Sequence, residues 1–160
     1  MNKAIFLDRD GVLNRENGNY ISRLEEFIIN DGVFEGLKYF QQKDYLLIVI
    51  TNQGGISKGM YDHEDVDKIH NYLREKLEQD GIKITAIYYC PHHPVRSKCI
   101  CRKPDSLMLE KAMARFNIDA ARSYFIGDHD RDIEAGKKTG LQTIKIIANS
   151  SLLEVKGLIK

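Results

Sequence analysis

Residues 45–50 read Tyr45-Leu46-Leu47-Ile48-Val49-Ile50, a continuous apolar run with branched side chains. A run without polar alternation predicts a strand that is buried on both faces, as in a parallel sheet. A similar run over residues 4–7 stops at Asp8. Further strands are predicted over residues 84–89, 124–126 and 141–147, and helical spacing over residues 33–40, 62–80, 106–116 and 130–139. This alternation predicts an α/β fold, a Rossmann-like parallel sheet with helices on both faces, which binds ligands beyond the carboxyl ends of its strands.

Length and composition indicate one domain spanning residues 1–160, because 42% hydrophobic content supports one core and 160 residues are too few for two ordinary ones. The 24 basic and 23 acidic side chains leave a net charge of +1, which disfavours a nucleic-acid-binding surface. No apolar run is long enough for a membrane span, and the N-terminus has no signal-peptide pattern. We therefore expect a cytoplasmic monomer that acts on a small molecule, without nucleic-acid or membrane partners.

Polar residues follow several predicted strands at the point where each strand ends. Asp8, Thr51 and Asp128 occupy such positions, and Asp10 places a second carboxylate two residues after Asp8. Carboxylates this close repel each other, and a divalent cation with oxygen ligands, such as Mg²⁺, would relieve the repulsion. The alternative is that Asp8 and Asp10 only turn the chain, but the agreement among strand ends favours a metal site. We interpret Asp130 as the N-cap of the following helix.

A second cluster of metal-ligand residues lies in residues 90–101. Cys90, His92, Cys99 and Cys101 follow the spacing C-x-H-x₆-C-x-C, and three thiolates with one imidazole suit a closed tetrahedral Zn²⁺ site. Free buried thiols are the alternative, and His93 could replace His92 as a ligand. We expect structural zinc in this loop, because Cys101 directly precedes two cationic residues that would be fixed against the sheet edge.

Four motifs resemble those of the haloacid dehalogenase (HAD) superfamily of phosphatases. They are Asp8-Arg9-Asp10-Gly11-Val12-Leu13-Asn14, Ile50-Thr51-Asn52-Gln53, Arg102-Lys103-Pro104, and Gly127-Asp128 with Asp132. All four occur in order and span residues 8–132, so the resemblance covers most of the chain. It implies a HAD fold and a phosphoric monoester hydrolase.

The resemblance also implies roles for particular residues. Asp8 would be the nucleophile that forms an aspartyl-phosphate, and Asp10 the general acid and base. Thr51 and Lys103 would hold the phosphoryl oxygens. The implied Mg²⁺ ligands are Asp8, the backbone carbonyl of Asp10, and Asp128.

Two further positions near the metal have more indirect implied roles. Asp132 would orient Lys103 or a metal-bound water. His129 would contribute at most its backbone or a water to the metal site.

The zinc loop resembles that of one HAD branch, which contains the D-glycero-D-manno-heptose 1,7-bisphosphate 7-phosphatases and histidinol-phosphatases. Residues 51–59 and 88–94 are more similar to the heptose enzymes, and His92 is the ligand that the branch favours. The chain has no room for a large cap domain, so loops would bind the substrate. The residues expected to do so are Asn17, Gly18, Asn19, Tyr20, Asn52, Gln53, Gly54 and Arg102, the last at the distal part of the substrate, such as an anomeric phosphate.

Other features keep two alternatives open. Only six residues separate His92 from Cys99, which is closer to the histidinol-phosphatase loop, and Leu107-Met108 stand where heptose enzymes usually have Gly-Met. A histidinol-phosphate phosphatase is therefore the first alternative. A phospho-receiver or inactive scaffold is the second, although a receiver would not need Asp10 to protonate a leaving group.

Overall fold

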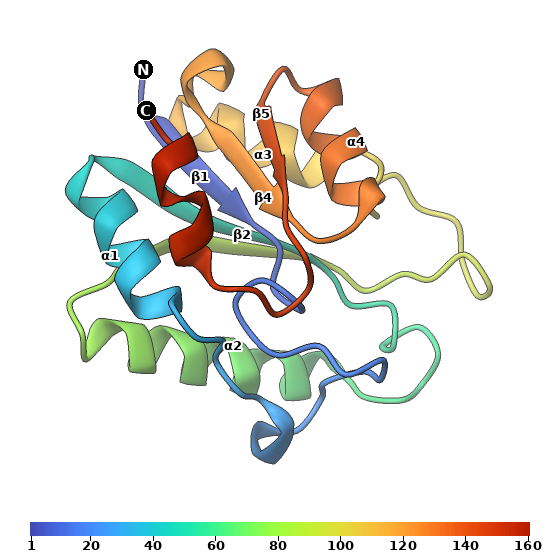
Figure 1. Cartoon of the computed structure of the whole chain (residues 1–160). Helices are drawn as coiled ribbons and strands as arrows, with labels where there is room; N and C mark the ends of the chain where they lie inside the picture. Colours follow the sequence, from blue (N-terminus) through green and yellow to red (C-terminus); the bar gives the residue numbers. More distant parts are fainter.

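The computed structural model describes residues 1–160 and contains one five-stranded sheet in the order β3-β2-β1-β4-β5, with every neighbouring pair parallel (Figure 1). The strands are β1 (Lys3–Leu7), β2 (Tyr45–Asn52), β3 (Ile84–Cys90), β4 (Tyr124–Gly127) and β5 (Gln142–Lys145). All five expected strands are present, and the parallel α/β prediction is confirmed. The last strand is shorter than the apolar pattern over residues 141–147 indicates.

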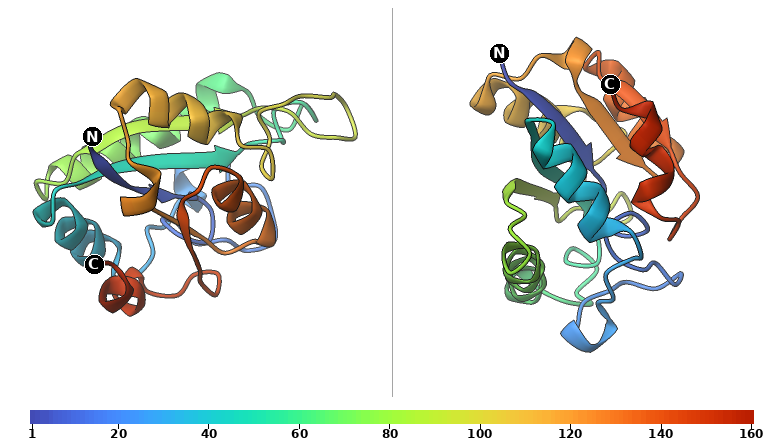
Figure 2. Two further views of the ribbon diagram at one scale, coloured as in Figure 1. Left: turned by 90° about the horizontal axis from the view of Figure 1, so that it is seen from above. Right: turned by 60° about the vertical axis from the view of Figure 1, so that its left-hand side comes forward.

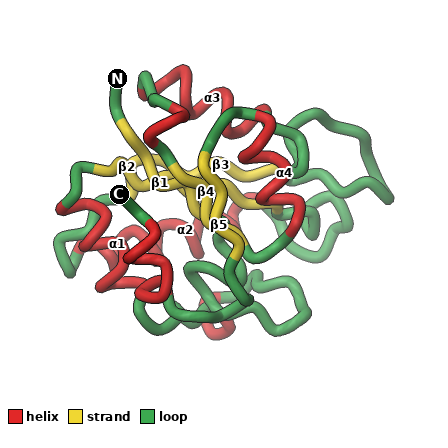
Figure 3. Tube along the Cα trace, turned by 45° about the horizontal axis from the view of Figure 1, so that its top comes forward, coloured by secondary structure: helices red, strands yellow, loops and turns green.

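Helices cover both faces of the sheet, as two views at right angles show (Figure 2). The α-helices are α1 (Val33–Gln42), α2 (His63–Glu78), α3 (Leu107–Phe116) and α4 (Asp130–Lys138). Short 3₁₀ helices are η1 (Leu24–Glu26), η2 (Ala120–Arg122) and η3 (Leu152–Leu158). Figure 3 shows the strands as a central layer between the helices.

The core consists of two apolar layers, one on each face of the sheet. Alternate side chains of β1 divide between them, with Ile5 and Leu7 facing the layer formed with α1, α2 and η3, while Phe6 faces the layer formed with α3 and α4. The middle strands are buried on both faces, which explains why residues 45–50 are apolar without alternation.

The C-terminal segment forms a packed element that the sequence pattern does not predict. Leu152 and Val155 of η3 are buried in the layer that contains α1. Gly36 of α1 allows this approach, since a Cβ there would lie 2.8 Å from the Cβ of Leu152. None of the helices combines the length and apolar character needed to cross a membrane.

One helix cap differs from its prediction. Asp130 is the first residue of α4, and His129 is the N-cap. The backbone N–H of His129 donates to Asp132 Oδ2 at 3.1 Å, whereas the Asp130 carboxylate pairs with Lys145 at 2.6 Å. The interpretation of Asp130 as the cap is therefore wrong, because Asp132 provides the reciprocal bond from inside the first turn.

Candidate active site

The carboxyl ends of β1, β2 and β4 meet around the buried ammonium of Lys103. Its Nζ lies 2.9 Å from Asp8 Oδ1 and 2.7 Å from Asp132 Oδ1, and it donates to the carbonyl of Ile50 at 2.8 Å. Lys103 is 1% exposed. Although burial opposes its charge, the two carboxylates raise the pKa of Lys103, so it stays protonated.

Asp8 is a buried carboxylate whose charge is only partly compensated. Burial raises its pKa to about 7, against the attraction of Lys103, and the charge of Asp132 adds to the rise. A buried carboxylate whose charge is only partly compensated tends to bind a proton or a further cation.

Asp10 is surrounded by hydrogen-bond donors. Arg9 Nη2 lies 2.8 Å from Asp10 Oδ1, Asn14 Nδ2 donates to the same oxygen at 2.9 Å, and Gln53 Nε2 donates to Oδ2 at 3.1 Å. Burial acts to raise the pKa of Asp10, but the Arg9 charge and these donors outweigh it and hold the pKa below its usual range. Each aspartate of the first motif therefore has its own cation, Lys103 for Asp8 and Arg9 for Asp10.

Gln53 joins Asp10 to the end of β2. Its Nε2 also donates to Thr51 Oγ1 at 2.9 Å, and its Oε1 accepts from the Tyr61 hydroxyl at 2.7 Å. Burial raises the pKa of Tyr61 to about 12, so its hydroxyl remains a donor. Both polar ends of the Gln53 side chain are thus fixed, which orients its amide toward Asp10 and Thr51.

Three carboxylates form a candidate site for a hard cation. Ligand oxygens of Asp8, Asp128 and Asp132 lie within 4.8 Å of one another, and all three residues are buried. Asp128 Oδ1 has no hydrogen-bond partner, and burial raises the pKa of Asp128. A buried carboxylate oxygen without a donor fits a cation ligand, and an oxygen-only set suits Mg²⁺.

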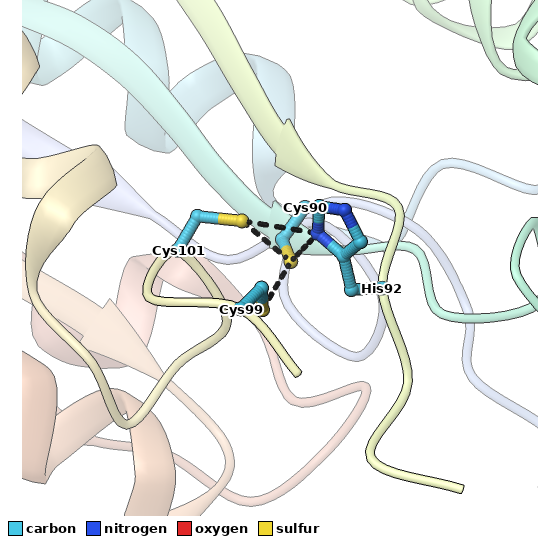
Figure 4. Close-up of side chains that lie close together, drawn as sticks. All are labelled: Cys90, His92, Cys99 and Cys101. Atoms are coloured by element: carbon cyan, nitrogen blue, oxygen red, sulfur yellow. Dashed lines mark hydrogen bonds between the residues drawn. The ribbon is translucent and has the colours of Figure 1, made fainter. Parts of the chain in front are cut away.

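The cysteine cluster comes together at the end of β3, as Figure 4 shows. Cys90 Sγ lies 3.0 Å from Cys101 Sγ and 3.7 Å from Cys99 Sγ, while His92 Nδ1 lies 3.3 Å from Cys101 Sγ. With Zn–S bonds of about 2.3 Å, tetrahedral sulfur ligands would be about 3.8 Å apart, so these four side chains need little adjustment to hold Zn²⁺. His92, not His93, belongs to the cluster.

A cavity of about 340 Å³ opens over Asp8 and Asp10. Its lining includes seven of the eight expected substrate residues, namely Gly18, Asn19, Tyr20, Asn52, Gln53, Gly54 and Arg102. Thr51 and Lys103 are buried and do not line the cavity themselves. Each contacts a residue that does, because Thr51 accepts a hydrogen bond from Gln53 and Lys103 pairs with Asp8. Arg102 Nη1 donates to the carbonyl of His92 at 3.0 Å, which connects the cysteine cluster to the cavity wall.

Comparison with known proteins agrees with this arrangement. Residues 100–149 match a family model described as HAD-hydrolase-like. The chain is 37% identical to the D-glycero-beta-D-manno-heptose-1,7-bisphosphate 7-phosphatase of Haemophilus ducreyi, over 97% of this chain and 88% of the relative. It belongs to the heptose-bisphosphate phosphatase family of HAD hydrolases. This phosphatase is also 41% identical to the D-glycero-alpha-D-manno-heptose-1,7-bisphosphate 7-phosphatase of Campylobacter jejuni, over 91% of this chain and 82% of the relative.

A solved relative supports the same assignment. The crystal structure of D,D-heptose 1,7-bisphosphate phosphatase from B. bronchiseptica, complexed with magnesium and phosphate, superposes with a TM-score of 0.83. The two are 28% identical, over 98% of this chain and 97% of that chain. The HAD fold expected from the motifs is therefore confirmed.

In this HAD phosphatase, one of the expected substrate residues lies outside the cavity, and five residues that were not expected line it. Asn17 does not line it; its Oδ1 accepts from the backbone N–H of Asn19 at 3.0 Å and so shapes the loop. The additional lining residues are Glu16, Ile21, His93, His129 and Arg131.

Arg9 and Tyr61 are buried and do not line the cavity, but they contact two residues that do, Asp10 and Gln53. An arginine between two aspartates was a usable signal for Arg9. Nothing in the pattern distinguishes Tyr61 from a core tyrosine.

Proposed function

We propose that this enzyme removes the 7-phosphate of D-glycero-D-manno-heptose 1,7-bisphosphate through an aspartyl-phosphate at Asp8. The observation that carries the proposal is a cavity with Asp8 and Asp10 at its base and Arg102 and Arg131 in its wall. Neither arginine forms an ion pair, and Arg131 Nε is buried without a hydrogen-bond partner. A substrate with a second phosphate, away from the reacting one, would provide the anion that these guanidinium groups lack.

In the first step, a carboxylate oxygen of Asp8 would attack phosphorus, and the bond between phosphorus and the sugar oxygen would break. Asp10 would give its proton to the leaving alkoxide. Asp10 needs a raised proton affinity for this step, and the incoming phosphate dianion would supply it through like-charge repulsion. In the second step, Asp10 would take a proton from water as that water attacks the aspartyl-phosphate, which releases phosphate and restores Asp8.

Several side chains would hold the reacting groups in place. Lys103 would neutralise charge on the phosphoryl oxygens while it fixes Asp8, and Asp132 would position Lys103 from the other side. The Thr51 hydroxyl would donate to a phosphoryl oxygen. Gln53, through its bonds to Asp10 and Thr51, would keep the general acid and the phosphate ligand in register.

Asp8, the backbone carbonyl of Asp10, and Asp128 would hold Mg²⁺, in keeping with the unpaired Asp128 oxygen. When bound, Mg²⁺ supplies electrostatic stabilisation of the charge on the transferring phosphoryl group. Cys90, His92, Cys99 and Cys101 would hold a structural Zn²⁺ that fixes Arg102 and Lys103.

We also propose that residues 1–160 act as one cytoplasmic, monomeric phosphatase domain in which the zinc loop, residues 90–101, replaces a large cap. The cluster of unbonded cysteines supports a reducing compartment. Every group assigned to the reaction lies within one protomer.

Phosphate release with Mg²⁺ present tests the function. Both anomers of the heptose 1,7-bisphosphate should be hydrolysed in preference to histidinol phosphate, with loss of the 7-phosphate, and Asp8→Asn should abolish turnover. Arg102→Ala should raise KM for the bisphosphate about tenfold or more and leave p-nitrophenyl phosphate hydrolysis unchanged. Preference for histidinol phosphate would contradict the substrate. An Asp10→Asn variant that still turned over the sugar phosphate at the parent rate would contradict the mechanism.

A further inference from the structure

The segment between β5 and η3 passes beside the loop that follows β1 (Figure 1). Asn149 of this segment binds both backbone polar groups of Glu16. The Glu16 N–H donates to Asn149 Oδ1 at 2.7 Å, and Asn149 Nδ2 donates to the Glu16 carbonyl at 2.8 Å. The backbone N–H of Asn149 also donates to the carbonyl of Gly11 at 2.8 Å. One residue therefore attaches the C-terminal segment to two points near the site.

The attached loop forms one wall of the cavity. Glu16, Gly18, Asn19 and Tyr20 all line it. The bonds to Asn149 are the only hydrogen bonds that join residues 16–20 to any other part of the chain. At the other end of the loop, the Tyr20 ring packs on Tyr61 with ring centroids 6.0 Å apart. The wall thus depends on a polar attachment at its start and an aromatic contact at its end.

The backbone at Asn149 has a φ of +65°, a conformation that asparagine adopts more readily than most residues. This conformation, together with the primary amide, allows the side chain to present a donor and an acceptor to Glu16 at the same time. Glycine would keep the backbone conformation and remove both side-chain hydrogen bonds to Glu16. Asn149→Gly therefore separates the effect of these bonds from the effect of the backbone conformation.

We propose that Asn149 is a positioning residue that sets the shape of the substrate loop, residues 16–20, and thereby the affinity for the sugar portion of the substrate. This inference rests on the proposed function, in which that loop contacts the substrate beyond its reacting phosphate. Asn149 does not line the cavity and lies outside the chemistry. It acts through Glu16, and the C-terminal segment becomes part of substrate recognition.

The test compares Asn149→Gly with Asn117→Gly. Asn117, at the end of α3, also has a positive φ, +50°, and its side chain forms no hydrogen bond. In Asn149→Gly, we expect ¹⁵N order parameters of residues 16–20 to fall below about 0.6. KM for the heptose bisphosphate should rise roughly tenfold with kcat within about twofold, the size expected for two hydrogen bonds. Hydrolysis of p-nitrophenyl phosphate should not change, and Asn117→Gly should match the parent in every measurement.

Unchanged order parameters would overturn the proposed attachment. A mobile loop with an unchanged KM would overturn the role in substrate affinity. If the parent enzyme does not hydrolyse the bisphosphate at all, the proposed function fails. The order parameters then decide by themselves whether Asn149 fixes the loop.

Discussion

The side-chain amide of Asn52 binds both backbone polar groups of Lys103. Asn52 Oδ1 accepts from the Lys103 N–H at 3.0 Å, and Nδ2 donates to the Lys103 carbonyl at 3.1 Å. This pair connects the end of β2 to the segment that follows the cysteine cluster, across 51 residues of sequence. The position of the Lys103 ammonium between Asp8 and Asp132 therefore depends on a residue that does not touch the ammonium itself.

Asn52→Ala should lower kcat/KM about tenfold to a hundredfold, because small displacements of a catalytic group have large effects on rate. The free energy of unfolding should fall by only about 1–3 kcal/mol for the two lost bonds. Kinetics and thermal denaturation check both values. Asn2→Ala is the matched control, since its amide also bonds a backbone carbonyl, that of Phe116, away from the site. Equal activity losses in the two variants would contradict the prediction.

Gly11→Ala should abolish activity. Gly11 has a φ of +85°, and a Cβ there would lie 2.3 Å from Asp128 Oδ2, so the side chain must displace the proposed Mg²⁺ ligand. Gly81→Ala is the control, because Gly81 has a φ of +74° with nothing within 4 Å of the added atom. In both variants, the strained backbone conformation should lower the free energy of unfolding by about 1–2 kcal/mol. Only Gly11→Ala should lose at least about a hundredfold in kcat.

Mg²⁺ should raise the melting temperature more at pH 8 than at pH 5.5. The pKa of Asp8 rises from 3.8 to about 7 on folding. Between these values, the folded protein binds a proton that the unfolded chain releases, so the contribution of Asp8 to stability falls as pH rises. Above pH 7, the ionised carboxylate, only partly compensated by Lys103, is free to bind a cation, whereas at pH 5.5 the cation must displace the proton.

We expect the difference between the two melting-temperature increments to be about 5 °C or more, which differential scanning calorimetry can measure. In Asp8→Asn the increments at the two pH values should become more similar. Equal increments in the parent enzyme would show that the proton and Mg²⁺ do not compete for Asp8.

Removal of zinc should lower stability and substrate affinity together. Cys101 precedes Arg102, and the His92 carbonyl accepts from Arg102, so an unfolded loop would release the cavity wall. Cys90→Ser or exhaustive chelation should lower the melting temperature by about 10 °C or more. KM for the bisphosphate should also rise. Val95→Ala, at an exposed position of the same loop, should do neither. A zinc-free enzyme with parent stability and KM would refute a structural role for the ion.

The sequence predicts the fold well because parallel strands leave a strong pattern. Residues 45–50 must be apolar when both faces of β2 are covered, and the polar residues that end the strands meet at one edge by topology. The expected strands and α-helices are all present, with boundaries that differ by a few residues. The 3₁₀ helix η3 has too short a pattern to be recognised, although its burial against α1 is considerable.

The site is less predictable where contacts depend on the conformation of a loop. Four motifs locate Asp8, Asp10, Lys103 and Asp128; the three aspartates lie just beyond strand ends, whereas Lys103 lies in the loop between β3 and α3. Asn149 has no sequence signal, because its partner Glu16 is 133 residues away and the bonds go to backbone groups. Arg131, in contrast, lies inside the fourth motif, between Asp128 and Asp132, and this position was a usable signal for the cavity wall.

The central position of β1 has a consequence for folding. Its two neighbours are β2 and β4, so its register is complete only when Phe6 pairs with both Ile48 and Phe125. During synthesis, the backbone N–H and C=O groups on the edge of β1 that β4 later covers stay unpaired until most of the chain has emerged. Closing such long loops is slow, and an unpaired edge on a strand with apolar side chains favours aggregation. The strand that leads into Asp8, the proposed nucleophile, is thus among the first segments made and among the last to be fully enclosed.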